Sequence, residues 1–251
     1  MAVRPGRAWR SLSDDVTYPA FMLRRSVPWP DWQRRRDYYW EGVLLWLDVD
    51  AEVRARSGGL RSLDDFARHF FAAAAPGAPA HTYDFDALCN ALDATAPGDW
   101  QTYLRGWVDA HDDLDTSRGL RRHGWRLVFS DTPSEAFHRA EEENGVTDLT
   151  YSAGFTVTDT GQVRTVMWGG PAFHIGLRPG TRIIAVDGTS FSSARLLDAV
   201  RDARRVAVKM TVEQDGKSGE QTLPYRGTLR YPLLERVGSV PDSLTTLLAA
   251  R

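Results

Sequence analysis

The side chains able to do metal or acid–base chemistry are spread along this sequence rather than gathered in one motif. No two of the six histidines have the spacing of a His-Glu-x-x-His zinc motif, and His138 with Glu141, half of such a motif, is interpreted as a solvated surface pair. An acidic run after residue 108 is interpreted as a hydrated loop, with a metal site as the alternative. The histidines are His69, His81, His111, His123, His138 and His174, and the acidic run holds Asp109, His111, Asp112, Asp113 and Asp115.

Nucleophilic and nucleotide chemistry have little support from the motifs. Ser152 lies in Thr150-Tyr-Ser-Ala-Gly154, which has only the second glycine of a nucleophile elbow, so a serine hydrolase is not expected. The sequence contains no Gly-x-Gly-x-x-Gly and no phosphate-binding loop. A single cysteine, Cys89, excludes a disulfide framework and a cysteine zinc cluster within one chain.

The composition is that of a folded soluble protein, without the marks of a nucleic-acid or membrane partner. Its 251 residues are 42% hydrophobic and 25% charged, which suits one large or two modest cores. Only Lys209 and Lys217 are lysines, and the many arginines are spread along the chain and balanced by acids to a net charge of −2. No apolar run approaches the ~18 residues of a membrane span, and no apolar segment follows the arginines at the start as in a signal peptide. We therefore expect a cytoplasmic protein, or an extracytoplasmic one if an intact precursor carries a signal.

The first half of the chain has the apolar spacing of helices. Asp31 is expected to cap a helix of residues 32–57, because a Pro-Trp-Pro run precedes it and two glycines follow the helix. A second helix is expected after Ser62, with Asp65 completing a capping box. Seven of the nine tryptophans lie in the first 107 residues, which indicates two domains with different cores. Further short helices are expected over residues 83–94 and 99–108.

Strand-like runs bounded by turn residues are predicted after residue 123, with one helix of residues 192–204 among them. The dipeptides Asp187-Gly188 and Asp215-Gly216 are turn signals. Residues 134–143 are interpreted as a charged helix or as a solvated loop. The predicted strands are residues 125–129, 150–158, 162–168, 182–186 and 206–213. A small, partly open β-barrel with one main helix fits this order.

Residues 169–188 carry a specific pattern, Gly-Gly-Pro-Ala-Phe-His-Ile-Gly-Leu-Arg-Pro-Gly-Thr-Arg-Ile-Ile-Ala-Val-Asp-Gly. Pro171 begins a single helical turn, and Gly176 ends it so that Leu177 enters the core. A Pro-Gly pair then turns the chain into the next strand. The stretch resembles a PDZ domain of the bacterial type, with Thr181 where an Asp is more usual.

The PDZ resemblance implies a peptide-binding groove. In PDZ domains a peptide C-terminus adds as a strand beside the main helix, and backbone N–H groups of a glycine-containing loop hold its carboxylate. By order along the chain, that loop is residues 152–155, and the groove lies between residues 155–157 and the main helix. The alternative is that Phe155, Leu196 and Val200 are simply core. The implied peptide-binding residues are Ala153, Gly154, Phe155, Leu196 and Val200.

A second stretch, residues 29–54, reads Trp-Pro-Asp-Trp-Gln-Arg-Arg-Arg-Asp-Tyr-Tyr-Trp-Glu-Gly-Val-Leu-Leu-Trp-Leu-Asp-Val-Asp-Ala-Glu-Val-Arg. With the Ser-Gly-Gly and Ser-Leu-Asp-Asp runs that follow, it resembles the C-terminal part of the glycyl aminopeptidase family of zinc metallopeptidases. The resemblance continues in the family's order over nearly the whole chain, through residues 66–71, 83–107, the PDZ stretch and 225–236.

This second resemblance implies a gluzincin-type, thermolysin-like catalytic domain that continues into a helical subdomain and a PDZ domain. The family's zinc ligands and general-base Glu lie upstream of the Tyr-Tyr-x-x-Gly helix, so the resemblance implies no metal ligand and no cofactor in this chain, and zinc in the intact enzyme. Tyr39 matches the family tyrosine that faces the zinc and donates a hydrogen bond to the tetrahedral oxyanion. The alternative is that Tyr39 is a buried aromatic residue whose hydroxyl is satisfied locally.

We therefore expect an α+β fold, in which a helical subdomain of a thermolysin-like peptidase is followed by a PDZ-type partly open β-barrel. The expected division is a helical subdomain over residues 1–125, a connector over 126–148, a PDZ domain over 149–228 and a tail over 229–251 that packs on the core.

The expected function is that of a C-terminal fragment or degenerate relative of a glycyl-aminopeptidase-like zinc metallopeptidase, inactive alone. Its intact form would remove small N-terminal residues such as Gly or Ala. The alternative is a non-catalytic pseudopeptidase whose PDZ domain binds peptide C-termini or a partner protein. The expected partners are a peptide or protein C-terminus and the missing zinc-binding half, and neither nucleic acid nor a membrane.

Overall fold

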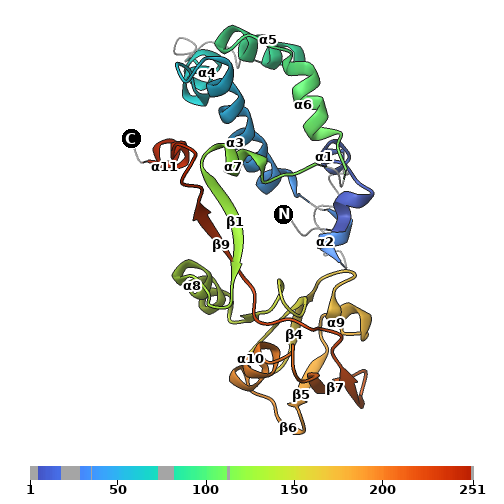
Figure 1. The fold of residues 1–251 in the computed structure, drawn as a ribbon. Helices are drawn as coiled ribbons and strands as arrows, with labels where there is room; N and C mark the ends of the chain where they lie inside the picture. Colours follow the sequence, from blue (N-terminus) through green and yellow to red (C-terminus); the bar gives the residue numbers. More distant parts are fainter. Residues whose placement is uncertain (1–4, 18–28, 35, 73–81, 112–113, 250–251) are drawn as a thin grey trace. The chain divides into compact units, whose positions relative to one another are not determined.

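The computed structural model describes residues 5–17, 29–34, 36–72, 82–111 and 114–249. The chain forms two compact units (Figure 1). The helical unit comprises residues 1–27, 33–126 and 236–251, and the strand unit comprises residues 28–32 and 127–235. The division does not fall at a single point along the chain, because residues 28–32 belong to the strand unit and residues 236–251 belong to the helical unit.

The helical unit is built around the long helix α3, Tyr38–Arg56. Its buried core joins apolar residues of α3, such as Val49 and Val53, to Phe66, Trp100 and Trp107 of the helices that follow. The other elements of this unit are η1 (Pro5–Ala8), α1 (Leu12–Val16), α4 (Leu63–Phe70), α5 (Phe85–Thr95), α6 (Trp100–Val108), α7 (Arg118–Arg122) and α11 (Ser243–Leu248).

The expected single helix from Trp32 is broken before α3. The short helix α2 spans Pro30–Gln33, and Arg34 and Arg36 then adopt positive φ angles of 49° and 61°, which no helix tolerates. This left-handed backbone is supported by the buried guanidinium of Arg34, which pairs with Glu41 and donates from Nη1 to the carbonyl oxygen of Arg10 at 2.6 Å. The expected N-cap, Asp31, instead lies inside α2.

The predicted starts of three other helices are confirmed. Ser62 and Asp65 form the capping box of α4. The carboxylate of Asp84 accepts the Ala87 N–H at 2.8 Å at the start of α5, and that of Asp99 accepts the Thr102 N–H at 3.0 Å at the start of α6.

The strand unit contains two open sheets, and the described residues form no closed barrel. One sheet has the order β2-β3-β4 and the other the order β6-β5-β7-β8, while β1 pairs with β9. This confirms the expected α+β class. The strands are β1 (Trp125–Ser130), β2 (Thr147–Asp148), β3 (Phe155–Val157), β4 (Val163–Val166), β5 (Arg182–Val186), β6 (Thr189–Ser190), β7 (Lys209–Gln214), β8 (Lys217–Thr222) and β9 (Tyr231–Arg236), and the helices are α8 (Glu135–Asn144), α9 (Pro171–His174) and α10 (Ser193–Arg201).

The predicted turns of the strand unit are confirmed. Asp187 and Gly188 both have positive φ, and so do Asp215 and Gly216, which form the two-residue connection between β7 and β8. The strand β8 was not expected, because its sequence Lys-Ser-Gly-Glu-Gln-Thr is polar and almost wholly exposed. Its pairing with β7 follows from the turn rather than from its own side chains.

Four aromatic rings from distant parts of the sequence form a cluster in the strand unit. Trp168 lies in contact with Trp32 at 4.8 Å, with Trp29 at 5.4 Å and with Phe173 at 4.6 Å between ring centroids. The Oδ2 atom of Asp31 accepts the backbone N–H of Trp168 at 2.7 Å. Residues 29–32 are thereby fixed to the strand unit, although they lie in the tryptophan-rich first half.

None of the helices in the described ranges is long and apolar enough to cross a membrane.

Candidate functional site

The loop between β2 and β3 is held rigidly against α9. Gly154 has a φ of 83°, and a Cβ atom there would lie 3.3 Å from the Cδ atom of Pro171. The Ala153 carbonyl accepts the Ala172 N–H at 3.0 Å, and the Gly154 carbonyl accepts the Met167 N–H at 2.8 Å. The glycine is therefore required both by its backbone conformation and by the close approach of α9.

Two backbone N–H groups of this loop converge on one oxygen atom. The N–H groups of Ser152 and Gly154 donate to the carbonyl oxygen of Leu149, at 3.0 and 2.9 Å. The Ser152 hydroxyl, in turn, accepts the Arg230 N–H at 2.9 Å. Backbone N–H groups of a turn that point at one acceptor favour a negatively charged oxygen there. This arrangement has the chemistry needed to hold a carboxylate.

The structure brings together the five residues expected to line the peptide groove, but it places them in the interior of the strand unit rather than on its surface. The side chains of Phe155, Leu196 and Val200 are each 0% exposed and belong to one core cluster, together with Ala153. Gly154 is also buried. Their burial agrees with the core alternative, and their contact with a peptide stays a prediction.

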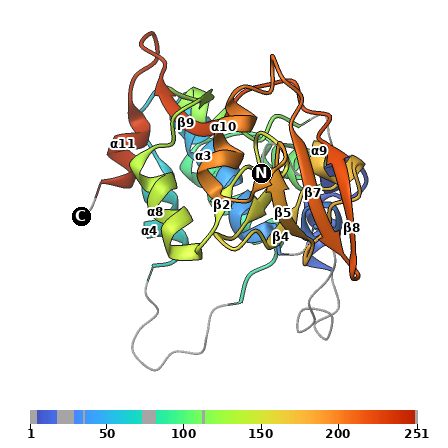
Figure 2. The same cartoon turned by 90° about the horizontal axis from the view of Figure 1, so that it is seen from below.

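A neighbouring face of α10 lines a surface cavity that the sequence analysis missed. Ser193, Leu197 and Arg201 follow one another at four-residue intervals, and with Thr147 of β2 and residues of α8 they border a cavity of about 540 Å³. The elements α8, β2 and α10 are labelled in Figure 2. The helical period could have revealed this face of α10 from the sequence, because Leu197 directly follows the buried Leu196 and so lies on the adjacent face. The lining combines four carboxylates, those of Asp131, Glu141, Glu142 and Asp159, with apolar side chains such as Val146 and Leu229.

Tyr39, the expected oxyanion donor, lies in the first turn of α3. Its side chain is 64% exposed, so it is not the buried aromatic residue of the alternative interpretation. Its ring contacts that of Tyr38, with centroids 4.6 Å apart. Trp40 and Val43 beside it are exposed too. A catalytic role for Tyr39 stays a prediction.

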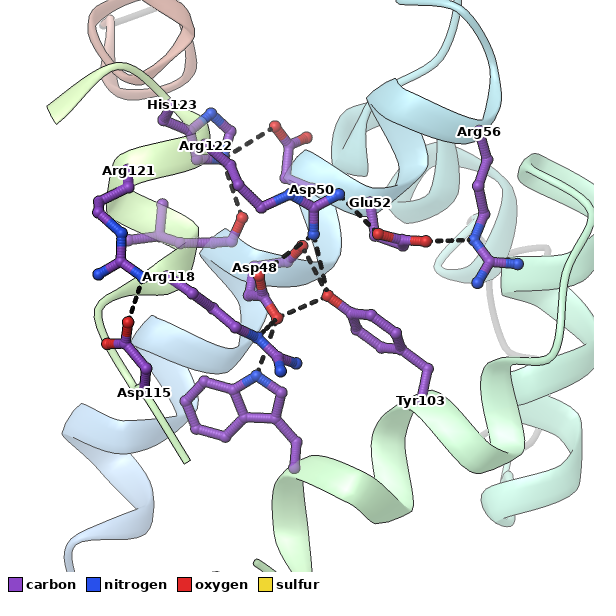
Figure 3. A network of polar contacts seen from close by, with 12 residues as sticks. Asp48, Asp50, Glu52, Arg56, Tyr103, Asp115, Arg118, Arg121, Arg122 and His123 are labelled. Atoms are coloured by element: carbon purple, nitrogen blue, oxygen red, sulfur yellow. Dashed lines mark hydrogen bonds and ion pairs between the residues drawn. The ribbon is translucent and has the colours of Figure 1, made fainter. Parts of the chain in front are cut away.

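A network of acids and partly exposed arginines centres on the buried Asp48, further along α3 (Figure 3). The Asp48 Oδ2 atom accepts hydrogen bonds from Tyr103 Oη at 2.5 Å, Trp107 Nε1 at 2.9 Å and Arg118 Nε at 2.6 Å. Its Oδ1 atom lies 3.3 Å from Arg122 Nη1. The carboxylate is 0% exposed and its acceptor sites are filled by these donors, so it stabilises the fold rather than binding a substrate.

The same network shifts the pKa values of two further side chains. Burial, followed by the hydrogen bond to Asp48, raises the pKa of Tyr103, because both disfavour a phenolate. Burial alone would raise the pKa of Glu52, but hydrogen bonds from Arg56 and Arg122 outweigh it and lower the pKa. Both shifts are explained by partners within the fold.

The histidines and the acidic run do not assemble a metal site in the described part of the chain. His123 is buried between the Leu47 carbonyl oxygen and the Ser243 hydroxyl, at 2.8 and 2.6 Å. Asp115 pairs with Arg121, whereas His81, Asp112 and Asp113 lie outside the described residues. Among the described residues no group of three or more His, Cys, Asp or Glu side chains is placed to hold a metal ion. These residues therefore do not fit the zinc that the family resemblance implies for an intact enzyme.

Comparison with known proteins identifies the strand unit more closely than the helical unit. Residues 146–213 match the PDZ domain family. The structure is similar to that of an aminopeptidase N family protein from Idiomarina loihiensis, with a TM-score of 0.59 and 16% identity over 94% of this chain and 40% of that chain. It also matches the HtrA3 PDZ domain bound to a phage-derived ligand (FGRWV), with a TM-score of 0.23 and 17% identity over 46% of this chain and 88% of that chain. No curated protein sequence matches the chain.

These similarities concern the fold of the chain and its PDZ domain. The chain spans two fifths of the length of the aminopeptidase N family structure, and at this level of identity the likeness concerns the fold. The strand unit carries a PDZ domain over residues 146–213, and the chain, which also contains a helical unit, is similar in fold to part of an aminopeptidase N family protein.

Proposed function

We propose that the strand unit binds the C-terminus of a peptide or protein partner. The observation that carries this proposal is the convergence of the Ser152 and Gly154 N–H groups on one oxygen position, in a loop of the PDZ match. PDZ domains bind peptides by adding them as a strand to a sheet edge, with main-chain hydrogen bonds for affinity and side-chain pockets for specificity. The carboxylate of the ligand would take the place next to these two N–H groups.

The proposal is tested by calorimetry with pairs of peptides that differ only at the C-terminus. One peptide of each pair ends in a free carboxylate and the other in a carboxamide, which removes the negative charge and keeps the shape. We expect binding of the acid and a loss of at least tenfold in affinity for the amide, since a charge-assisted hydrogen bond contributes about 1.5–3 kcal/mol. Equal affinity of the two forms would refute carboxylate recognition.

We further propose that the chain corresponds to the helical and PDZ part of a glycyl-aminopeptidase-like peptidase. The shared fold with an aminopeptidase N family protein over 94% of this chain supports this relationship. The exposed apolar side chains of Tyr39, Trp40 and Val43, at the start of α3, support a further part of such an enzyme packing there. Because the described residues do not fit a zinc site, we assign no hydrolysis to them and no catalytic step to Tyr39.

Metal analysis and an activity assay test this second proposal. We expect no stoichiometric zinc and no cleavage of glycyl substrates by this chain alone. One tightly held zinc per chain together with activity on glycyl peptides would contradict it. In the pseudopeptidase alternative the chain acts only through its PDZ domain, so adding a separately produced zinc-binding half would restore no activity.

A further inference from the structure

The sheet edge at which a peptide would add is already occupied by the chain itself. In the order β2-β3-β4, one edge of β3 pairs with β4 and the other pairs with β2. The register places Thr147 opposite Val157 and Asp148 opposite Thr156, in an antiparallel pair. A peptide strand beside β3 therefore needs the positions that β2 now holds.

Leu149, directly after β2, has the contacts of a bound C-terminal residue. Its N–H donates to the carbonyl oxygen of Phe155 at 2.9 Å, which continues the ladder between the strands. Its carbonyl oxygen receives the two converging N–H groups of Ser152 and Gly154. Its side chain is 0% exposed and belongs to the core of the strand unit. The oxygen of Leu149 thus fills the position proposed above for a ligand carboxylate.

The chain direction agrees with this comparison. β2 runs antiparallel to β3 and toward the loop of residues 150–154, as the last residues of a peptide would. Resting on the proposed peptide binding, we propose that residues 147–149, the groove segment, are an internal ligand of the PDZ domain. A peptide C-terminus then binds only after the groove segment has left the edge of β3.

The outer edge of the groove segment does not offer a second place for a peptide strand. In an antiparallel pair the N–H groups alternate in direction, so the Asp148 N–H points away from β3. It donates to the Oε1 atom of Glu141 in α8 at 2.7 Å, and the Asp148 side chain accepts the Thr150 N–H at 2.8 Å. A main-chain donor covered by a carboxylate is closed to strand addition.

The groove segment is short, and its release would expose Leu149. Two residue pairs and the hydrogen bond from the Leu149 N–H to the Phe155 carbonyl join it to β3, and it is entered through Gly145, whose φ of 61° ends α8. The cavity of about 540 Å³ borders Thr147 and gives the segment room on its outer side. The exposure of Leu149 during release would be offset by an apolar last residue of the ligand entering the same site. The preferred ligand therefore ends in an apolar residue of about the size of Leu.

The first test measures whether loosening the groove segment improves peptide binding. The probe is a labelled synthetic peptide with the sequence of residues 144–149 and a free C-terminal carboxylate, titrated into the full chain by fluorescence polarisation. Thr147→Pro removes a ladder N–H, and Glu141→Ala removes the acceptor of the Asp148 N–H. We expect both variants to bind the probe about tenfold or more tightly than the wild type, because apparent affinity scales with the open fraction. Glu142→Ala is the matched control, since Glu142 lines the same cavity without accepting that N–H, and it should bind like the wild type.

The second test locks and releases the groove segment in one variant. Asp148 and Thr156 lie directly opposite each other in the pairing without ladder hydrogen bonds, where Cα atoms are about 4.5 Å apart and a disulfide fits. We expect the oxidised form of the double variant Asp148→Cys and Thr156→Cys to lose probe binding and the reduced form to regain it. This test remains decisive if Thr147→Pro does not fold.

Two outcomes would overturn the inference and separate it from the proposed function. If the wild type binds the free-acid probe as tightly as Thr147→Pro and Glu141→Ala, or the oxidised form binds as well as the reduced one, the groove segment is not an internal ligand, and peptide binding stands. If no form binds the probe or any other free-acid peptide, the proposed function fails and the inference fails with it.

Discussion

Trp32 stacks on Trp168, with ring centroids 4.8 Å apart and ring planes inclined by 28°. The first residue belongs to the short helix α2 and the second follows β4, and both are part of the strand unit. The segment of residues 29–32 is thus a component of the PDZ-containing unit rather than a piece of the helical core.

Replacing Trp32 by Ala is expected to destabilise the strand unit. The loss should be about 1–3 kcal/mol, because the ring is only half-buried but makes an aromatic pair with Trp168. Hydrogen exchange of the amides in β3 and β5 measures the effect in that unit. Trp40→Ala is the control, since Trp40 is 69% exposed and its removal should change little. Equal protection in the two variants would contradict the structural role of Trp32.

Removing the Asp48 carboxylate is expected to destabilise the helical unit strongly. Asp48→Ala leaves Arg118, Tyr103 and Trp107 without their shared acceptor, which should cost about 3–5 kcal/mol. Asp115→Ala is the matched variant, because Asp115 also pairs with an arginine but its side chain is half-exposed. This substitution should lower the free energy of unfolding by only about 0–1 kcal/mol. Urea unfolding followed through α3 and α6 compares them, and a similar small loss in both would refute the assigned role of Asp48.

Acid is expected to weaken the attachment of α11. The hydrogen bond from Trp125, followed by those from the Thr245 backbone and side chain, lowers the pKa of Asp242 to about 2. Since the pKa is lower in the folded than in the unfolded state, this carboxylate stabilises the fold above about pH 4 and loses its effect as the pH falls toward 2. Asp242→Asn should therefore show a smaller loss of stability between pH 4 and 2 than the wild type. An unchanged slope in urea midpoints across that window would contradict this assignment.

Cys89 is expected to react slowly in the native protein. Its side chain is 4% exposed in α5, and burial raises the pKa of the thiol, so little reactive thiolate is present. Modification with a disulfide reagent should be slow in buffer and fast in urea. Fast native modification would show that α5 opens readily, and would also require a Cys89→Ala background for the disulfide test of the groove segment.

The sequence predicted the elements whose signals are local. The capping box of α4, the Asp-Gly turns and the strand β5 depend on neighbouring residues and were all found. The PDZ stretch was also recognisable, because its glycines and prolines have fixed roles in turns.

The features that escaped prediction depend on contacts between distant residues. The break before α3 requires the buried pair of Arg34 and Glu41, and an arginine run alone does not show that its members have left the helix. The pairing of β2 with β3 was missed for the same reason, since Thr147 and Asp148 carry no strand signal of their own. The occupied edge of β3 was therefore not foreseen, and peptide contact at the residues of the candidate site stays a prediction.

The most direct test of peptide-carboxylate binding is an amide NMR titration of the wild type and Thr147→Pro with the probe peptide. The account predicts that the free-acid peptide shifts the Ser152 and Gly154 amide signals, more readily in Thr147→Pro, and that the carboxamide leaves them in place. Perturbation of these two amides by acid and amide alike, or of neither by the acid in both proteins, would contradict it.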